Sequence, residues 1–563
     1  MLHLPELSRL LEVLSGPPSP HLILLTILFI VTWYTSLKGG FVSDDIEGVA
    51  QFSDRFIPEQ KLPTGQVIPE EKVDFYQFED KRVLRFSPKK VGEKDGNNLY
   101  RCGNRQLNPY LGFPACFMRW SRTNIGAKFV SLGKNKNGIE VFGYIQDTLR
   151  HHLFSLAIHL ANVILCYFFL TRLFGSTLGF MASALFCVYP LGCQTVAWIS
   201  GINYSFSLLG ALATFNIAQT VHNPYIFIPV AILTSFLSTL TLLTGIWNWV
   251  ILLILGRPEL ALISFLAGVF SFWNQGKEVI MIRRKAFKDQ HLGQSTFFYV
   301  RKLIVMIKTL WYYVVMIPLP KRLGLFHTWG YFYDEPMERT DKMFWKGFLS
   351  LIAIIAGIIL CPFPIKFGLI WIMVYLLIFS NFITAQQFVA DRYAFIPCLG
   401  WCVILAYLLQ SQPILFTFLL GFYAMRTIMH IPTFRNDTMF YQSNIWNFPD
   451  SEVALGNLGV TYMHSGLTGM AIDTWILATR VNPKYDVPWY NLYSAFRANG
   501  VFSQAKAYLD ECLKSKVIHF PDLWGQELKQ VEYAILVNSP LVEHIKQIDV
   551  RIKEVDYDSY RSV

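Results

Sequence analysis

Long apolar segments dominate this sequence and limit what it can fold into. The first covers residues 21–37, and ten more follow along the chain. These ten lie near 153–171, 178–198, 203–219, 225–243, 246–273, 300–318, 346–361, 364–385, 393–410 and 413–430. A helix of roughly 20 apolar residues crosses a bilayer core. The sequence therefore predicts an all-α, polytopic membrane protein with about 11 transmembrane helices.

Composition agrees with this prediction. Of the 563 residues, 53% are hydrophobic and 16% are charged, whereas soluble domains carry about 25% charged residues. No small-residue cleavage site follows 21–37, so we interpret this segment as a retained anchor and not as a signal peptide. The net charge of +10 does not indicate nucleic acid, because the basic residues are scattered through loops. The densest run, 81–94, is interpreted as a solvated loop or as a surface attracted to anionic lipid headgroups.

The cysteines predict no metal site. Nine are dispersed along the chain, with no CxxC pair and no zinc pattern. Cys102 and Cys116 share one loop, and they could form a disulfide if that loop is extracytoplasmic.

Basic residues help to choose between topologies. The segment 246–273 is interrupted by Arg257-Pro258 and could be one crossing or two short elements. One crossing leaves the cluster 283–285 on the cytoplasmic side, as the positive-inside rule requires, and two would place it outside. We prefer one crossing. It leaves everything after about 431 on the same side as Asp44.

Four regions follow from these segments. Residues 1–37 form the first transmembrane helix with a short N-terminal segment. Residues 38–150 are mostly polar and are predicted to form a large extracytoplasmic loop with some helices lying in the membrane interface. Residues 151–430 form the multispanning domain. Residues 431–563 form an extracytoplasmic helical domain.

This last region repeats itself at a period of 34 residues. Five pairs show the period: Leu455 and Trp489, Leu458 and Leu492, Gly466 and Gly500, Ala471 and Ala505, and Ala478 and Cys512. The period and residue types are typical of tetratricopeptide (TPR) repeats. The second unit is degenerate, with Tyr493 in place of the usual Gly. We predict a partner-binding surface that includes Leu458, Tyr462, Trp475 and Trp489, and the alternative is a structural cap on the membrane domain.

Candidate polar residues gather near one end of the apolar segments. Asp44 and Asp45 directly follow the first segment, where paired carboxylates can act as a general base or hold a cation. His152, His159 and Asn162 share one helix face, and polar groups at such depth usually face a bundle interior or a water-filled cavity. Asp391-Arg392 returns to the same end between two later segments. The alternatives are a solvated turn for the aspartates, packing roles for the histidines and a structural salt bridge for Asp391–Arg392.

Several short motifs carry a resemblance to a known family. They are Phe41-Val-Ser-Asp44-Asp45, His152 to Asn162 with Arg172-Leu-Phe-Gly175, Val196-Ala-Trp198-Ile-Ser-Gly201, Asp391-Arg392-Tyr-Ala-Phe-Ile-Pro397 and Arg435-Asn436-Asp437. In this order, and followed by the repeats, the chain resembles the GT-C superfamily of membrane glycosyltransferases with C-terminal TPR repeats. The transmembrane-and-TPR O-mannosyltransferases and their bacterial relatives belong to this group.

The resemblance implies a sugar transfer from a polyprenyl-phosphate donor to a protein or glycan acceptor on the extracytoplasmic face, with inversion. It implies Asp44 or Asp45 as the base, Arg392 as a ligand of the donor phosphate and His152 as an acceptor contact. The donor and acceptor site would further include His159, Asn162 and Asp391. Arg119 and Arg122 stand in for a Tyr-Arg-Pro motif of the family. A divalent cation at the carboxylates is left open.

The chain departs from the family pattern at several places, and a basic-acidic pair usual after Ser-Gly is replaced by Ile202-Asn203-Tyr204. Relatives often have His-Pro-x-His-x-Glu before Val-Ala-Trp, whereas this chain has Tyr189-Pro190-Leu-Gly192-Cys-Gln194. The alternative function is therefore a catalytically inactive GT-C-fold scaffold that uses its repeats to hold partners in an envelope assembly. A transporter is a third hypothesis, and no inverted repeat supports it.

Compartment is predicted from two features. Asn203-Tyr-Ser and Asn436-Asp-Thr would be glycosylation acceptors in an endoplasmic reticulum protein. The short repeat region instead favours a bacterial inner membrane, with the repeats on the extracytoplasmic side.

Overall fold

The computed structural model describes residues 20–43, 147–221, 223–271, 298–327, 340–381, 389–483 and 485–514, together with Glu532 and short strands between 60 and 146. This part of the chain contains 18 α-helices, and the predicted all-α class is confirmed. The chain divides into two compact units. Unit 1 comprises Met1–Leu325 and Trp329–Phe440, and unit 2 comprises Phe326–Thr328 and Tyr441–Val563.

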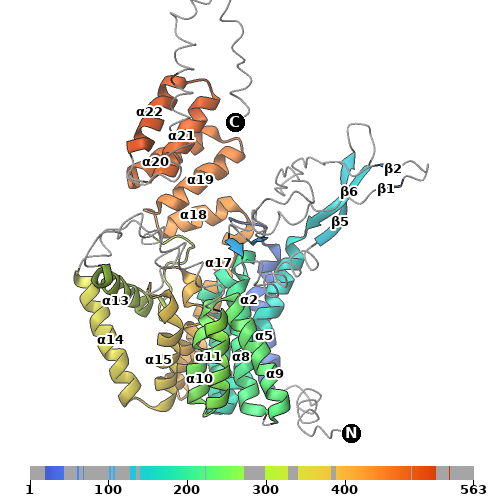
Figure 1. Ribbon diagram of the computed structural model, residues 1–563, viewed down its shortest axis with the longest axis vertical. Helices are drawn as coiled ribbons and strands as arrows, with labels where there is room; N and C mark the ends of the chain where they lie inside the picture. The colour runs from blue at the N-terminus through green and yellow to red at the C-terminus, as the bar shows by residue number, and fades with distance from the viewer. Residues whose placement is uncertain are drawn as a thin grey trace, which may run out of the picture. The chain divides into compact units, whose positions relative to one another are not determined.

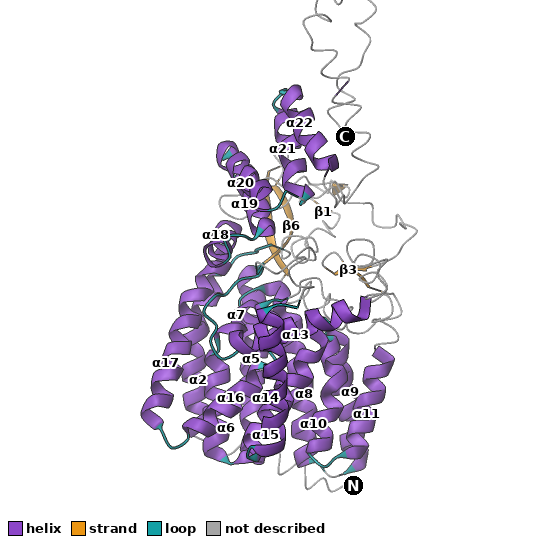
Figure 2. Ribbon diagram, turned by 90° about the vertical axis from the view of Figure 1, so that its left-hand side faces the viewer, coloured by secondary structure: helices purple, strands orange, loops and turns teal. Residues whose placement is uncertain are grey.

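The first half of unit 1 contains helices that run side by side in Figures 1 and 2. They are α2 (Pro20–Trp33), α5 (Thr148–Phe174), α6 (Ser176–Val188), α8 (Ile202–Thr220) and α9 (Pro224–Thr241). The short elements η1 (Tyr34–Lys38), η4 (Pro190–Gly192), α7 (Cys193–Val196) and η5 (Ile199–Gly201) lie between them in the chain. Local sequence sets several ends. Asp147 caps α5 by accepting a hydrogen bond from the Leu149 N–H at 3.0 Å, and Gly175 ends it with φ +92°.

The second half of unit 1 is more interrupted. Its elements are η6 (Leu243–Trp247), α10 (Asn248–Ile254), α11 (Pro258–Ser271), α13 (Phe298–Met316), α14 (Lys342–Leu360), α15 (Phe363–Leu376), η10 (Leu377–Phe379), η11 (Asp391–Ala394), α16 (Cys398–Leu409), α17 (Pro413–His430) and η12 (Ile431–Arg435). Helix α6 contacts α2, α5, α16 and α17, and most of its side chains are buried. It is therefore the central helix of this bundle.

The predicted count of about 11 crossings is wrong for the described residues. Four helical stretches there are long and apolar enough to cross a membrane: Pro20–Lys38, Thr148–Phe174, Lys342–Leu360 and Pro413–Arg435. A fifth is the pair Ser176–Val188 and Pro190–Val196, which is bent by 52°. Among the other apolar segments, α16 has only 12 residues, α8 carries polar side chains, and α13 carries polar and charged ones. Hydropathy alone does not detect these breaks.

The segment 246–273 is one such correction. It contains two helices, α10 and α11, and not the single crossing that the sequence predicts. Gly256 between them has φ +72°, a conformation that favours glycine, and Pro258 begins α11 without an N–H to donate. Gly256 and Pro258 therefore determine the turn between the two helices.

In the region 38–150, the described residues from 60 to 146 form three antiparallel hairpins: β1 (Gln60–Lys61) with β2 (Val67–Ile68), β3 (Tyr100–Cys102) with β4 (Arg105–Leu107), and β5 (Ala127–Lys134) with β6 (Glu140–Gln146). Most of the predicted loop, including any interfacial helices, lies outside the described residues. The register of the longest pairs Ala127 with Gln146 and is interrupted between Ser131 and Gly133. The β-branched and aromatic residues of β6, Val141, Phe142, Tyr144 and Ile145, favour a strand.

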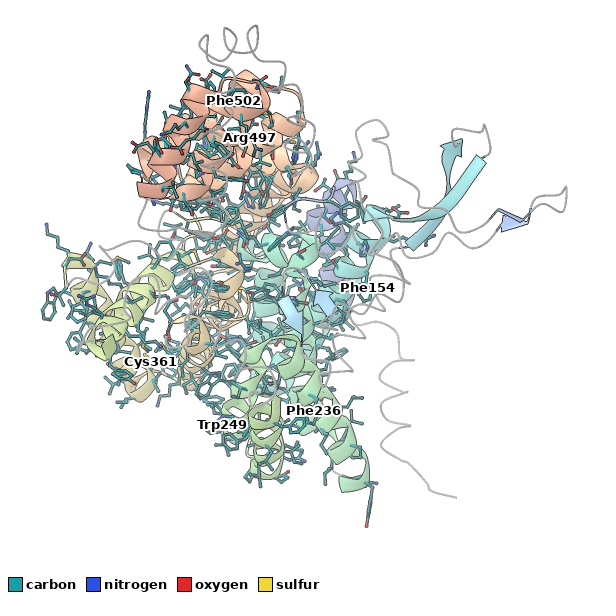
Figure 3. All side chains as sticks on the ribbon, turned by 45° about the horizontal axis from the view of Figure 1, so that its top comes forward. Phe154, Phe236, Trp249, Cys361, Arg497 and Phe502 are labelled. Carbon is teal, nitrogen blue, oxygen red and sulfur yellow. The ribbon has the colours of Figure 1, made fainter. Side chains whose placement is uncertain are left out.

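Close backbone contacts pack the bundle. Helices α15 and α16 cross at Gly368 and Gly400, where a Cβ on either residue would lie 2.5 or 2.4 Å from the carbonyl oxygen of the other. Small residues allow this approach, as is typical of helix packing in membranes. Aromatic side chains fill the wider contacts. Phe236 of α9 and Trp249 of α10 lie 5.9 and 6.0 Å from phenylalanine rings of α11 (Figure 3).

Polar groups inside the bundle are paired between helices. The Ser207 hydroxyl of α8 donates to the carbonyl of Ser238 at 2.9 Å and lies 3.0 Å from the Thr244 hydroxyl. Asn248 donates to the Ser238 hydroxyl and accepts from the Tyr375 hydroxyl at 2.9 Å. Such interhelical hydrogen bonds contribute about 1 kcal/mol each in membrane proteins. They join α8, α9, α10 and α15.

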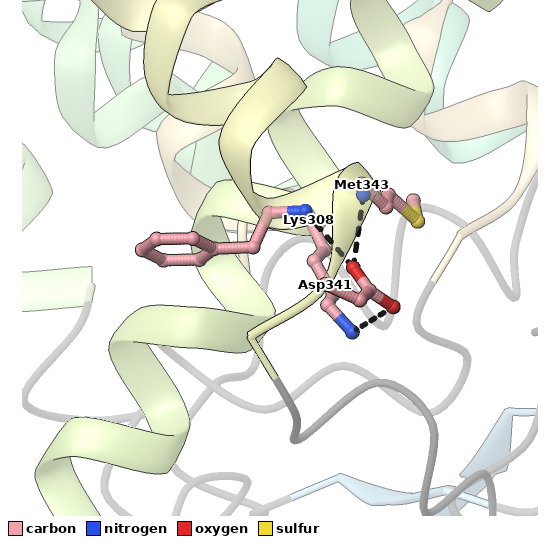
Figure 4. Close-up of polar contacts among 4 residues, drawn as sticks. Lys308, Asp341 and Met343 are labelled. Atoms are coloured by element: carbon pink, nitrogen blue, oxygen red, sulfur yellow. Dashed lines mark hydrogen bonds and ion pairs between the residues drawn. The ribbon is translucent and has the colours of Figure 1, made fainter.

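A buried lysine joins α13 to the start of α14. The Lys308 ammonium, 1% exposed, lies 2.9 Å from Oδ2 of Asp341 (Figure 4). The other oxygen of Asp341 accepts from the N–H groups of Met343 and Phe344 and so caps α14. Desolvation raises the pKa of Asp341, but the hydrogen bonds from Lys308 and the backbone outweigh it, and the pKa is lowered overall. The charge on Lys308 is therefore balanced where the two helices meet.

Unit 2 contains two helix pairs with the same spacing. After α18 (Asp437–Asn447), in which the division between units falls, come α19 (Glu452–His464), α20 (Thr468–Val481), α21 (Asp486–Ala498) and α22 (Phe502–Lys514) (Figure 1). Consecutive helices from α19 to α22 pack on one another. Gly466 and Gly500 end α19 and α21 with φ +76° and +75°, and they lie 34 positions apart. The sequence period is thus also a period of backbone conformation.

A short segment also belongs to unit 2. The Asn444 side chain accepts from the Phe326 N–H at 2.9 Å and donates to the Phe326 carbonyl at 2.8 Å. The ring of Phe326 stacks on Tyr441, and His327 lies against Phe448. A single asparagine thus satisfies both backbone groups of one residue, which holds the segment on α18.

The glycine crossing in unit 1 makes a testable prediction. Gly400→Ala places a Cβ against the Gly368 carbonyl, and rotamer changes cannot relieve a clash with backbone. We expect a loss of about 1–3 kcal/mol in stability, measured as a lower melting temperature of the detergent-solubilised chain. Gly421→Ala on α17 is the matched control, because nothing lies within 4 Å of its added Cβ. Equal melting of the two variants would contradict this packing.

Candidate functional site

The segment that leads to Asp44 and Asp45 is held by contacts from distant parts of unit 1. The Gly40 N–H donates to the Phe434 carbonyl at 3.2 Å. The Val42 carbonyl accepts from the indole N–H of Trp198 at 3.1 Å, and the Ser43 N–H donates to Oδ1 of Asp437 at 2.8 Å. The backbone of Gly39–Ser43 is therefore fixed up to the residue before the predicted carboxylates. Asp44 and Asp45 themselves lie outside the described residues.

Two glycines allow this close approach. A Cβ on Gly40 would lie 2.4 Å from the carbonyl oxygen of Arg435. A Cβ on Gly39 would lie 2.5 Å from Nε2 of His152. Any larger residue would separate this segment from its supports. Gly39 and Gly40 therefore let the segment after η1 pack closely against η12 and against the start of α5.

The polar face predicted on α5 is buried. His152, Ser155, His159 and Asn162 are all at most 1% exposed. Asn162 donates to the Ser205 carbonyl at 2.9 Å. Among the described residues, neither imidazole has a partner with hydrogen-bond geometry, although the backbone of Gly39 lies beside His152. Buried polar atoms of this kind are costly unless they bind water or a ligand.

His159 has an unusual environment on this face. Four aromatic rings surround it, with centroids 5.2–5.9 Å from the imidazole: Phe29, Trp33, Phe186 and Phe395. The rings come from α2, α6 and the loop before α16. They fill the space around His159 and favour a packing role for it. His152, nearer the start of α5, is the histidine beside the Gly39–Ser43 segment.

Asp391 and Arg392 belong to a second set of contacts, centred on Gln194. The Gln194 amide donates to Oδ2 of Asp391 at 3.2 Å and to the Gly324 carbonyl at 2.6 Å. Its oxygen accepts from the Arg392 backbone N–H at 3.3 Å. Oδ2 of Asp391 also accepts from the Gly324 N–H at 2.8 Å. Gln194 therefore ties η11 and the segment at Gly324 to α7.

The guanidinium of Arg392 connects the two sets. It lies over the ring of Trp198, 5.8 Å from the centroid, and over that of Tyr393 at 4.9 Å. Trp198 is the residue whose N–H holds Val42. The Gly39–Ser43 segment and the Arg392 guanidinium therefore contact the same indole, the first at its N–H and the second over its ring. Cation–π attraction favours this position of the guanidinium.

Tyr189, Gly192 and Gln194 are buried. The Tyr189 hydroxyl donates to the Ile317 carbonyl, and its ring packs on Tyr423 at 4.7 Å. The ring of Trp33 lies 3.5 Å from where a Cβ on Gly192 would be. Uncharged groups therefore occupy all three of these buried positions.

Other predicted residues lie elsewhere. Arg119, Arg122 and Cys116 fall outside the described residues, and Cys102 is in β3. Leu458, Tyr462 and Trp475 are buried inside the α19–α20 pair, where the Trp475 N–H donates to the Gly456 carbonyl at 2.9 Å. Trp489 donates to the Pro483 carbonyl at 3.0 Å. These repeat residues therefore hold helices together, and only Trp489 among them is partly exposed.

Sequence reasoning missed two contacts of the Gly39–Ser43 segment, Trp198 and Asp437. Both lie in motifs that had been noted, Val-Ala-Trp and Arg-Asn-Asp. No local signal pairs Ser43 with a residue 394 positions away.

In the described part of the chain, no three His, Cys, Asp or Glu side chains come together as metal ligands. Comparison with protein-family models, with curated proteins and with solved structures finds no match to this chain. The function proposed below therefore rests on the motifs and on this geometry.

Gln194 gives a testable prediction. Gln194→Glu keeps the shape but places a carboxylate against Oδ2 of Asp391 and the Gly324 carbonyl, two acceptors. An uncompensated buried charge costs about 3–5 kcal/mol, so we expect a marked fall in melting temperature. Asp391→Asn in the same chain supplies a donor and should restore part of the loss. Gln410→Glu, at an exposed position, is the control. Additive effects of Gln194→Glu and Asp391→Asn would contradict the contact.

Proposed function

We propose that this chain is an integral membrane glycosyltransferase of the GT-C type. It would transfer a sugar from a polyprenyl-phosphate-linked donor to a protein or glycan acceptor on the extracytoplasmic face. One observation carries the proposal. The segment ending at Ser43, directly before Asp44 and Asp45, is held by Trp198, and the Arg392 guanidinium lies over that same indole. A carboxylate pair beside a cation suits an acceptor that loses a proton and a donor that carries phosphate.

The chemistry follows from these roles. Asp44 or Asp45 would take the proton of the acceptor hydroxyl, whose oxygen attacks the anomeric carbon as the bond to the lipid phosphate breaks. Arg392 would stabilise the charge on the departing phosphate. One displacement inverts the anomeric carbon and leaves no covalent enzyme intermediate. The alternative role of the carboxylates is to hold a divalent cation beside the phosphate.

Other parts of the chain have proposed roles. The four or five long apolar helices support an integral membrane protein, which we assign to a bacterial inner membrane with the C-terminal helices on the extracytoplasmic side. The 34-residue period of α19–α22 supports a TPR-like domain that binds a protein partner. Membrane lipids would surround the apolar helices, and we propose no nucleic-acid partner.

A second function, a catalytically inactive scaffold of the same fold, is favoured by one observation. Tyr189, Gly192 and Gln194 replace titratable residues of the family, and their surroundings are complementary to the residues that this chain has. In this hypothesis the bundle anchors the repeats and the repeats hold envelope partners.

Carboxylate variants separate the two functions. The full chain in lipid nanodiscs is given synthetic polyprenyl-phosphate mannose, glucose and N-acetylglucosamine together with solubilised membrane acceptors, and release of polyprenyl phosphate is measured. We expect Asp44→Asn or Asp45→Asn to reduce release about 10²–10⁴-fold, the usual contribution of a general base. Asp54→Asn, another acidic residue of the same loop, is the control and should match the wild type.

The outcomes are distinct. Wild-type activity that survives in both aspartate variants would refute their assignment as base. Release by neither the wild type nor any variant, with unchanged melting, would favour the scaffold.

A further inference from the structure

The segment 317–325, which follows α13, has its backbone held by side chains from other elements. The Tyr423 hydroxyl of α17 donates to the Pro318 carbonyl at 2.9 Å. Toward the other end of the segment, Oδ2 of Asp391 accepts from the Gly324 N–H at 2.8 Å. The backbone of 317–325 is therefore fixed to unit 1 near both its ends.

Two basic side chains of this segment, Lys321 and Arg322, are exposed. Among the described residues, no carboxylate forms an ion pair with either of them. The acid that contacts the segment, Asp391, is 1% exposed and uses its Oδ2 to bind Gly324. The segment therefore presents two cations at the surface without a counter-ion in the described part of the chain.

Arg426 of α17 adds a third cation at the same place. Its Nη2 donates to the Lys321 carbonyl at 2.5 Å and to the Pro320 carbonyl at 3.5 Å. The N–H groups on its Nε and Nη1 have no partner among the described residues. A guanidinium presents such groups as a planar fork that matches the oxygens of a phosphate. The three cations therefore suit a phosphate-bearing ligand.

The face of α17 that carries Arg426 is otherwise apolar. Phe422 and Met429 lie on that face, four residues before and three residues after Arg426, and they are 43% and 67% exposed. Helix α17 belongs to the stretch Pro413–Arg435, which is long and apolar enough to cross a membrane. Exposed apolar side chains on such a helix face lipid tails, and a cation among them reaches toward the headgroup region. Cations and apolar side chains together are complementary to a lipid.

We propose that Lys321, Arg322 and Arg426 bind the headgroup phosphate of an anionic phospholipid, and that its acyl chains lie along Phe422 and Met429. This inference is independent of the proposed transferase function and rests on the membrane insertion of α17. A soluble anion would use the cations alone, whereas a lipid uses both the cations and the apolar face. Near a membrane surface, each basic residue strengthens the attraction of anionic lipid about fivefold.

The test compares two lipids that have identical acyl chains and different headgroups. The full detergent-solubilised chain is titrated with phosphatidylglycerol, which is anionic, or with phosphatidylcholine, which has no net charge, and native mass spectrometry measures the bound fraction. We expect the wild type to bind phosphatidylglycerol at least about tenfold more tightly than phosphatidylcholine, because three cations contribute.

Substitution of the exposed cations identifies the site. Lys321→Gln and Arg322→Gln in one chain should lower the affinity for phosphatidylglycerol about 10–30-fold and leave that for phosphatidylcholine unchanged. Both side chains are exposed, so the melting temperature should stay that of the wild type. Lys342→Gln is the matched control, since Lys342 is an exposed lysine at the start of α14, another candidate membrane span. It should keep the wild-type affinity.

Four results would overturn the inference. They are equal affinity of the wild type for the two lipids, unchanged affinity for phosphatidylglycerol in the double variant, and an equally large loss in Lys342→Gln, which indicates a general attraction to surface charge. The fourth is displacement of phosphatidylglycerol by an equal concentration of soluble glycerol phosphate, which indicates a site for free phosphate and no role for the apolar face. We expect no displacement.

Discussion

The hydrogen bond from the Trp198 indole to the Val42 carbonyl is the contact on which the candidate site depends. Through this bond the indole holds Val42, near the end of the segment that leads to the Asp44–Asp45 pair. The Arg392 guanidinium lies over the ring of the same indole. A buried indole N–H has to find an acceptor, and here the acceptor is backbone, so the bond does not depend on a mobile side chain. This contact brings Val42, two residues before Asp44, to the same indole that the Arg392 guanidinium covers.

Two charged side chains elsewhere in unit 1 are likewise paired. Where a carboxylate enters the bundle, as Asp391 does, two donors meet it. Where a cation enters, as Lys308 does, a carboxylate lies at 2.9 Å. Burying a polar group without a partner costs free energy, whereas a buried hydrogen-bonded pair favours one specific arrangement of its helices. Neither His152 nor His159 has a hydrogen-bond partner of good geometry among the described residues, and of the two only His152 lies beside the Gly39–Ser43 segment. It is therefore the residue of α5 that best fits contact with a bound molecule.

Parts of this arrangement could be predicted from sequence, and the reasons are local. The spacing of His152, His159 and Asn162 fixed their common buried face, and hydropathy located α2, α5, α14 and α17. The number of crossings could not be predicted, because an apolar run looks the same whether its helix continues or breaks at a turn such as Gly256. Long-range contacts such as that of Ser43 with Asp437 leave no local pattern. Nor could sequence show that the Gln194 amide donates to Asp391.

The most direct test of this account is an experimental structure of the chain extracted with its native lipids. The transferase mechanism predicts a phosphate-bearing lipid whose phosphate oxygens lie within hydrogen-bond distance of the Arg392 guanidinium. It also predicts that a carboxylate of Asp44 or Asp45 faces the sugar carbon next to that phosphate. A structure in which no lipid phosphate reaches Arg392 and both carboxylates point away from it would contradict the mechanism. That result would leave a bundle that anchors the C-terminal helices and does no chemistry.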